Sequence, residues 1–220
     1  MRALIAELLA TCLLLATVVG SGIMGERLAA GNAAIALLAN SLATGAGLVA
    51  LILTFGPVSG AHMNPAVTAA ETCCGTIPRR TALGYVAAQL AGAFAGVAVA
   101  HAMFGLPVFA CSSHVRAGTA QLLGEFVATY ALLLVALACP RTAPAATPFA
   151  VGAVICAGYW FTSSTSFANP AVTLARAVTD TFTGIRPGDA PGFVAAQLLA
   201  TAAAVLTHRT ILVPRARTAP

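Results

Sequence analysis

The pentapeptide Asn-Pro-Ala-Val-Thr occurs twice in this 220-residue chain, at residues 64–68 and again at residues 169–173. Asn is a favoured N-cap residue, and Pro is favoured at the first helical position because its missing N–H would be unpaired there anyway. We therefore expect a helix to begin at each copy. The Asn oxygen caps the helix, which leaves the NH₂ group free to donate. Two identical helix starts indicate an internal repeat.

The chain around these copies is too apolar for a soluble domain. It is 59% hydrophobic and 8% charged, whereas a typical globular domain is about 25% charged. Six apolar runs are long enough to cross a hydrocarbon core of about 30 Å. They cover residues 3–20, 33–55, 82–104, 120–138, 148–163 and 192–212, and the fifth is short. The sequence predicts an all-α membrane protein with six transmembrane helices in the lipid bilayer.

The basic residues predict the orientation in the membrane. All 11 are Arg, and both termini are expected to be cytoplasmic because this arrangement satisfies the positive-inside rule. It places seven arginines inside (Arg2, Arg79, Arg80, Arg141, Arg209, Arg215, Arg217) and three outside (Arg27, Arg116, Arg186). We therefore expect a multi-pass protein of the plasma or inner membrane. The scattered arginines form no basic patch with aromatic neighbours, so no nucleic acid is expected as a partner.

Further matched sequences extend the repeat to the whole chain. Glu7 opens the sequence Glu-Leu-Leu-Ala-Thr, and Glu125 opens Glu-Phe-Val-Ala-Thr. Each half, about 1–115 and 116–220, has three apolar runs and one Asn-Pro segment, and an odd number of spans inverts the second half. We expect one domain, 1–220, with an inverted repeat. Glu7 and Glu125 are expected to accept hydrogen bonds from re-entrant backbone N–H groups, with a proton relay as the alternative.

Each Asn-Pro segment is expected to enter the membrane and return. From Pro65 to Cys74 is ten residues, about 15 Å of helix, or half the hydrocarbon thickness. The preceding residues 56–61 are expected to be extended, and the second half-helix is expected to run from Pro170 to about Asp180. The two helix N-termini would meet near the midplane and direct their positive dipole ends at one point.

Other functional classes have weaker support in the sequence. The six Cys residues show no metal-ligand spacing, so we expect packing roles, with a soft-metalloid contact at Cys73 and Cys74 as the alternative. No cofactor and no metal are expected. Neither G-x-S-x-G nor H-E-x-x-H is present, so an enzyme is not predicted. An ion-coupled secondary transporter remains an alternative because it also uses inverted repeats and broken helices.

These features together resemble the aquaporin, or major intrinsic protein, family. The features are the paired boxes (Asn64, Pro65, Ala66 and Asn169, Pro170, Ala171), the Ser-Gly-Ala-His sequence at 59–62, the two Glu residues and the six-run inverted repeat. The resemblance implies a homotetramer with one pore per subunit that passes small neutral solutes. It also implies that His62 either lines the pore or braces the first re-entrant loop.

The resemblance further implies a four-residue selectivity filter. Counting from the boxes assigns it to Thr44, Ala157, Ser166 and Val172. Water channels of the family typically have an aromatic residue, His and Arg at the first, second and fourth of these positions. The filter is therefore expected to be wide and neutral, similar to that of an arsenic-operon-associated branch. We expect a passive channel for arsenite or methylated arsenicals with some water, and the alternatives are a glycerol facilitator and a plain water channel.

Overall fold

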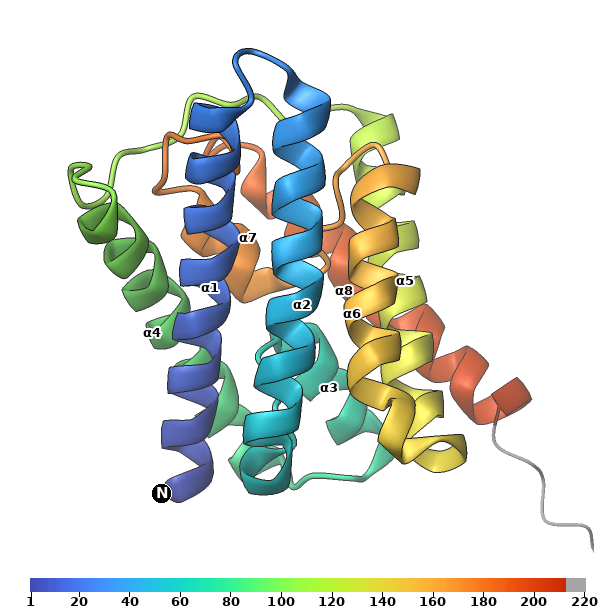
Figure 1. The fold of residues 1–220 in the computed structure, drawn as a ribbon. Coiled ribbons are helices and arrows are strands. Elements are labelled where there is room, and N and C mark those ends of the chain that lie inside the picture. The colour runs from blue at the N-terminus through green and yellow to red at the C-terminus, as the bar shows by residue number, and fades with distance from the viewer. Residues whose placement is uncertain (213–220) are drawn as a thin grey trace, which may run out of the picture.

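The computed structural model describes residues 1–212, and each of the six apolar runs forms a long helix there (Figure 1). The helices are α1 (Arg2–Leu28), α2 (Ala33–Ser59), α4 (Arg79–Met103), α5 (Thr119–Thr142), α6 (Thr147–Phe161) and α8 (Ala190–Thr207). A 3₁₀ turn, Pro144–Ala146, precedes α6, and a π turn, His208–Leu212, continues α8. The predicted fold class is confirmed. Arg215 and Arg217 lie outside the described residues.

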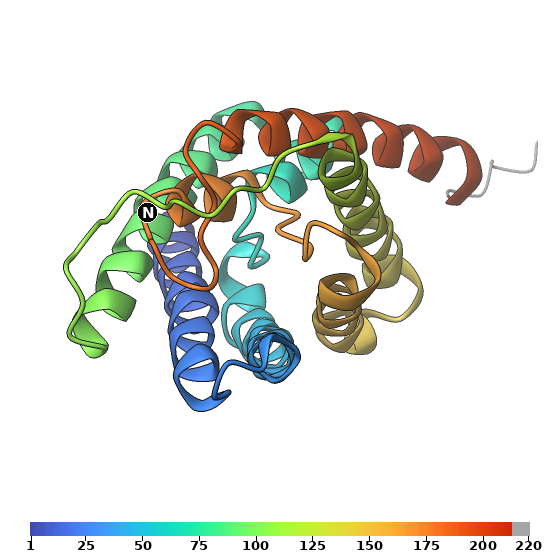
Figure 2. The same cartoon turned by 90° about the horizontal axis from the view of Figure 1, so that it is seen from above.

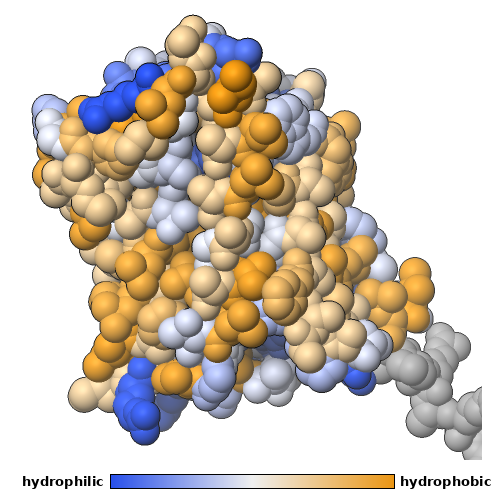
Figure 3. Space-filling model, in the orientation of Figure 1, coloured by the Kyte–Doolittle hydropathy of each residue, from blue (hydrophilic) through white to orange (hydrophobic). Residues whose placement is uncertain are grey.

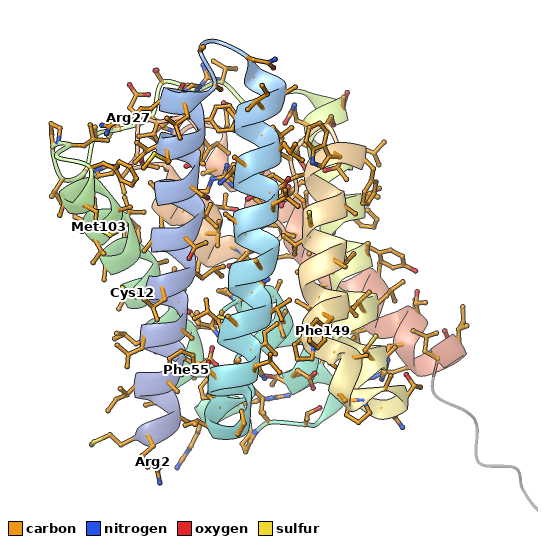
Figure 4. The ribbon with its side chains drawn as sticks, in the orientation of Figure 1. Arg2, Cys12, Arg27, Phe55, Met103 and Phe149 are labelled. Carbon is orange, nitrogen blue, oxygen red and sulfur yellow. The ribbon has the colours of Figure 1, made fainter. Side chains whose placement is uncertain are left out.

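The chain begins and the described part ends on the same side of the bundle. Figure 1 shows the start of α1 and the end of α8 at the lower edge, which we call the termini face. In Figure 4, Arg2 lies at the termini face and Arg27 lies at the other end, which we call the opposite face. The cytoplasmic side of the protein stays a prediction.

Two short helices fill the middle of the bundle. The helix α3 (Pro65–Cys74) has the predicted bounds and runs toward the termini face, whereas α7 (Pro170–Arg176) runs toward the opposite face. The helix α7 ends four residues before the predicted Asp180. The reason is that the next carbonyls accept other partners: Ala177 O bonds to the N–H of Ser112 (3.0 Å), and Val178 O bonds to the N–H of Ala110 (3.1 Å). Hydrogen bonds to residues 110–112 therefore replace the helical hydrogen bonds that would continue α7.

The extended segment before α3 is shorter than the sequence predicts. We expected residues 56–61 to be non-helical, but α2 continues through Pro57 to Ser59. Pro57 lies in the last turns, where the loss of one N–H removes one helical bond only. The helix ends at Gly60, whose φ of 87° lies in the left-handed region that glycine adopts readily. The non-helical segment therefore starts at Gly60.

Close helix packing encloses the half-helices. A Cβ atom at Gly96 of α4 would overlap the Cys12 carbonyl oxygen of α1, and one at Gly152 of α6 would lie 2.6 Å from the Gly45 carbonyl oxygen of α2. These contacts are of the small-residue type that favours helix association in membranes. Seen from above (Figure 2), α1, α2 and α4 form one group and α5, α6 and α8 the other, with α3 and α7 between them.

The outer surface matches a membrane environment. Large apolar side chains are exposed on several helices, among them Leu13, Leu42, Leu53, Leu83 and Leu199. Figure 3 shows apolar residues over the middle of the visible face and hydrophilic residues near its two ends. The protein is a multi-pass membrane protein.

Candidate functional site

The side chains of Asn64 and Asn169 connect the two half-helices at their N-termini. Asn64 Oδ1 accepts the N–H of Ala66 at 2.8 Å, and Asn64 Nδ2 donates to the carbonyl of Ala168 at 2.7 Å. Asn169 repeats the arrangement, since its Nδ2 donates to the carbonyl of Met63 at 2.8 Å. Each NH₂ group has two hydrogens. One hydrogen on each Asn therefore has no partner among these protein groups and is available to a molecule beside it.

A buried carboxylate holds the first extended segment. Glu7 Oε1 accepts from the Ser59 hydroxyl (2.7 Å) and from the N–H of His62 (2.9 Å). Glu7 Oε2 accepts from the N–H of Met63 (2.7 Å) and from Gln89 Nε2 (2.7 Å). We call these bonds the Glu7 clasp. Because protein donors occupy both oxygens, the geometry favours structural support over a proton relay.

The second extended segment is held in the same way. Glu125 accepts from the N–H groups of Phe167 (3.2 Å) and Ala168 and from Gln197 Nε2 (2.7 Å), which we call the Glu125 clasp. The residue before each Asn has a left-handed backbone, with φ of 50° at Met63 and 49° at Ala168. Such a backbone is unusual for a side-chain-bearing residue, and the surrounding bonds must maintain it. The clasps therefore fix the direction of both re-entrant segments.

A cavity of about 300 Å³ passes the two Asn side chains. One side of it is lined by apolar residues of four long helices, namely Leu14, Val18, Leu48, Ile52, Leu132, Val151 and Ile155. The other side consists of the two extended segments and their boxes. The carbonyls of Gly60, Ala61 and His62 accept no hydrogen bond from residues 1–212, and these three residues line the cavity. The lumen therefore combines an apolar wall with free donors and acceptors.

Three of the four expected filter residues line this cavity. They are Thr44, Ser166 and Val172. Ser166 Oγ has no partner among the described residues, although it is buried. The three side chains therefore meet in the part of the lumen between the Asn pair and the opposite face.

The prediction of Ala157 as the remaining filter residue is wrong. Ala157 is exposed on the outside of α6, and the lumen is lined instead by Ile155 and by Tyr159, whose hydroxyl lies 3.2 Å from the Thr44 hydroxyl. A helix turns about 100° per residue, so Ala157 faces away from the side that Ile155 and Tyr159 share. Counting back from Asn169 failed because it assumed a longer connection after α6. A phenol in place of a methyl group makes the opening narrower than the sequence predicted.

The structure also places two charged residues along the cavity to which the sequence analysis gave no role. Glu71 lines the cavity toward the termini face, and Arg176 lines it toward the opposite face. Each is the seventh residue after its box Asn. This equal spacing was the available signal, because α3 and α7 are related by the repeat. The filter residues alone predicted a neutral lumen, whereas Glu71 and Arg176 give it a charge on either side of the Asn pair.

His62 combines the two roles that the sequence analysis left open. Its ring lines the cavity, its Nδ1 lies 3.0 Å from the Thr68 hydroxyl, and it packs edge-on against Tyr85 with ring centroids 5.3 Å apart.

Among residues 1–212, no three or more His, Cys, Asp or Glu side chains lie close enough together to form a metal site.

A bundle in which two capped half-helices face each other across such a lumen is a membrane channel. Residues 1–166 match the family described as Major intrinsic protein, and the chain belongs to that family. Its members are channels for small solutes rather than enzymes, and this chain is one of these channels.

Individual relatives agree with this assignment. The aquaglyceroporin AqpS of Rhizobium meliloti (strain 1021) is 54% identical over 213 residues, which are 97% of this chain and 91% of that protein. Aquaporin-5 of Homo sapiens is 34% identical over 157 residues, which are 67% of this chain and 57% of that protein. The X-ray structure of the aquaglyceroporin from Plasmodium falciparum has a TM-score of 0.77 at 21% identity and covers 97% of both chains, so the fold is shared.

Proposed function

We propose that this protein is a passive channel for small uncharged solutes that carry several hydroxyl groups, with glycerol as the reference solute. The observation that carries the proposal is the two-sided lumen. Hydroxyl groups can bond to the Asn64 and Asn169 amides and to the free carbonyls of residues 60–62. The carbon backbone of the solute lies against the apolar wall formed by residues such as Leu48 and Ile155. Water can use the polar side alone.

Hydroxylated metalloids are the second candidate. Undissociated arsenite has three hydroxyl groups on one central atom, so it presents the same donors and acceptors as glycerol. Val172 supports this candidate because it places an apolar side chain in the lumen where many family members have Arg. A methylated arsenical could place its methyl group against Val172 and Ile155.

The Asn pair also supports exclusion of protons. A water molecule held through its oxygen by Asn64 and Asn169 directs its hydrogens away from both, and this orientation interrupts a proton wire. The N-termini of α3 and α7 point at the same place and disfavour cations there. From the resemblance we further propose a homotetramer. From the distribution of the arginines we propose that both termini are cytoplasmic.

The proposal is tested by stopped-flow uptake of water, glycerol, arsenite and a methylated arsenical into proteoliposomes. In Val172→Arg, the longer side chain should narrow the lumen. Part of the water flux should persist, while the flux of the larger solutes should fall at least about tenfold. Val172→Thr adds no bulk but exchanges a methyl group for a hydroxyl group. It is therefore the matched control for size, and it should pass glycerol at about the wild-type rate. Equal loss of all solutes in Val172→Arg, or loss of none, contradicts the proposal.

A further inference from the structure

Arg176 is a buried cation in the wall of the lumen. It has an exposed fraction of 2%, belongs to the last turn of α7, and lines the cavity four residues after Val172. One helical turn is about 3.6 residues, so both side chains lie on the same face of α7. The pore therefore has an arginine, one turn further from the Asn pair than the filter position.

The guanidinium of Arg176 is held on one side and open on the other. Its Nε donates to the carbonyl of Thr183, and its central carbon lies 3.3 Å from the centre of the Phe167 ring. No other hydrogen bond leaves this guanidinium within residues 1–212, although the group has five N–H donors. The remaining donors are available to the contents of the lumen.

The charge of Arg176 has no acidic partner. The only ion pair of the described residues joins Arg186 to Asp189. Glu125 is occupied by its clasp. The second cation near Arg176 is Arg116, whose guanidinium lies over the same Phe167 ring at 5.1 Å from its centre. Arg176 therefore faces the lumen without an acidic partner, with Arg116 as a second positive charge behind Phe167, and an Arg side chain remains protonated at neutral pH.

The other end of the pore has the opposite charge. Glu71 takes the position in α3 that Arg176 takes in α7, and it lines the cavity toward the termini face. A carboxylate there attracts cations into the lumen rather than excluding them. The helix N-termini at the Asn pair oppose a cation that enters from this end, and any further barrier against cations has to lie on the Arg176 side.

We propose that Arg176 is the residue that makes this pore selective for uncharged over cationic solutes, with Arg116 as a second positive charge behind it. This inference rests on the proposed channel function. Because Arg176 lies one helical turn beyond the filter position, that position is occupied by Val172 and the lumen keeps an apolar wall there. Cation exclusion and passage of larger neutral solutes are thereby assigned to separate residues.

Urea and guanidinium form a matched pair of probes because they are planar and nearly equal in size and differ in charge. The experiment measures uptake of both labelled solutes, and of glycerol, into proteoliposomes that contain the full-length protein. We expect wild type to pass urea and exclude guanidinium. Arg176→Gln should lower the urea-to-guanidinium ratio at least about tenfold. Arg176→Lys keeps the charge and should keep the ratio, as should Arg186→Gln, which removes an exposed arginine already paired with Asp189.

An Arg176→Gln protein that passes glycerol and still excludes guanidinium contradicts the inference. An equal fall of the ratio in Arg176→Lys also contradicts it, because a leak from altered packing would not depend on charge. If Arg176→Gln does not insert into membranes, Arg116→Gln decides: a lower ratio supports the inference and an unchanged ratio overturns it. A wild type that passes neither glycerol nor urea contradicts the channel function itself, whatever the variants do.

Discussion

The Glu7 clasp and the Glu125 clasp share three equivalent donors, and the Glu7 clasp adds the Ser59 hydroxyl. In each, a carboxylate accepts the N–H groups of the two residues before the box Asn, together with one Gln side chain. The same Gln also donates to the box Thr, at 3.0 Å from Gln89 to Thr68 and at 2.8 Å from Gln197 to Thr173. At the centre of the pore the two halves are thus alike.

The halves differ at the next shell of residues. The position two before Asn is His62 in the first half and Phe167 in the second. The position seven after Asn is Glu71 in the first and Arg176 in the second, and both line the cavity. The shared centre maintains the backbone of two re-entrant segments, a requirement that is the same in both halves. The divergent ends contact a solute as it enters, so selectivity depends on them.

The largest effect is expected from loss of either clasp. Glu7→Ala leaves the buried N–H groups of His62 and Met63 without an acceptor, and each such group costs about 1–3 kcal/mol. We expect a loss of about 3 kcal/mol or more of unfolding free energy, and a similar loss for Glu125→Ala. Thermal unfolding in detergent followed by size-exclusion chromatography measures it.

Glu26→Ala is the matched control for the clasp variants, because Glu26 is exposed at the end of α1, and it should unfold close to wild type. If Glu7→Ala were destabilised and Glu125→Ala were not, the two clasps would not be equivalent in energy despite their equal geometry.

The centre of the pore was more predictable from sequence than its ends. The repeated Asn-Pro sequence predicted the start of α3 because Asn64 and Pro65 are local signals of a helix start. The end of α7 was not predictable in this way, since it depends on bonds between Ala177, Val178 and the distant residues 110–112. The error at Ala157 has the same origin. Its position depends on the length of the connection after α6, and no local signal reports that length.

A smaller effect is expected from the difference between His62 and Phe167. Phe167 packs under Arg176 and Arg116 and edge-on against Phe193. A cation–π contact contributes about 0.5–2 kcal/mol according to its exposure, so Phe167→Leu should lose about 2 kcal/mol in the same assay. His62→Leu loses one hydrogen bond and one ring contact, and its loss should be about 1 kcal/mol. Equal losses in both variants would mean that the two arginines add nothing to the second half.

The smallest effect is expected from pH, and it comes from two acidic residues of the second half. The loop after α7 contains Asp180, which accepts the backbone N–H and the hydroxyl of Ser113, both at 2.9 Å. These hydrogen bonds lower the pKa of Asp180. The Arg186 contact and the N–H of Arg116 likewise lower the pKa of Asp189. The four residues between α3 and α4 contain no acidic residue, so the first half has no counterpart.

Because the folded pKa of Asp180 lies below its unfolded value of about 3.9, its contribution is present at neutral pH and is lost as the pH falls through the folded pKa. The melting temperature of wild type should therefore fall between pH 5 and pH 3, measured in detergent at about 0.1 M salt. Asp180→Asn removes the titrating group, so its fall should be smaller. Ser113→Ala keeps the backbone donor and loses the hydroxyl, so its fall should be intermediate. An identical fall in all three proteins would show that this loop contact does not couple to the stability of the bundle, and the acid sensitivity would then belong to other groups such as Asp189.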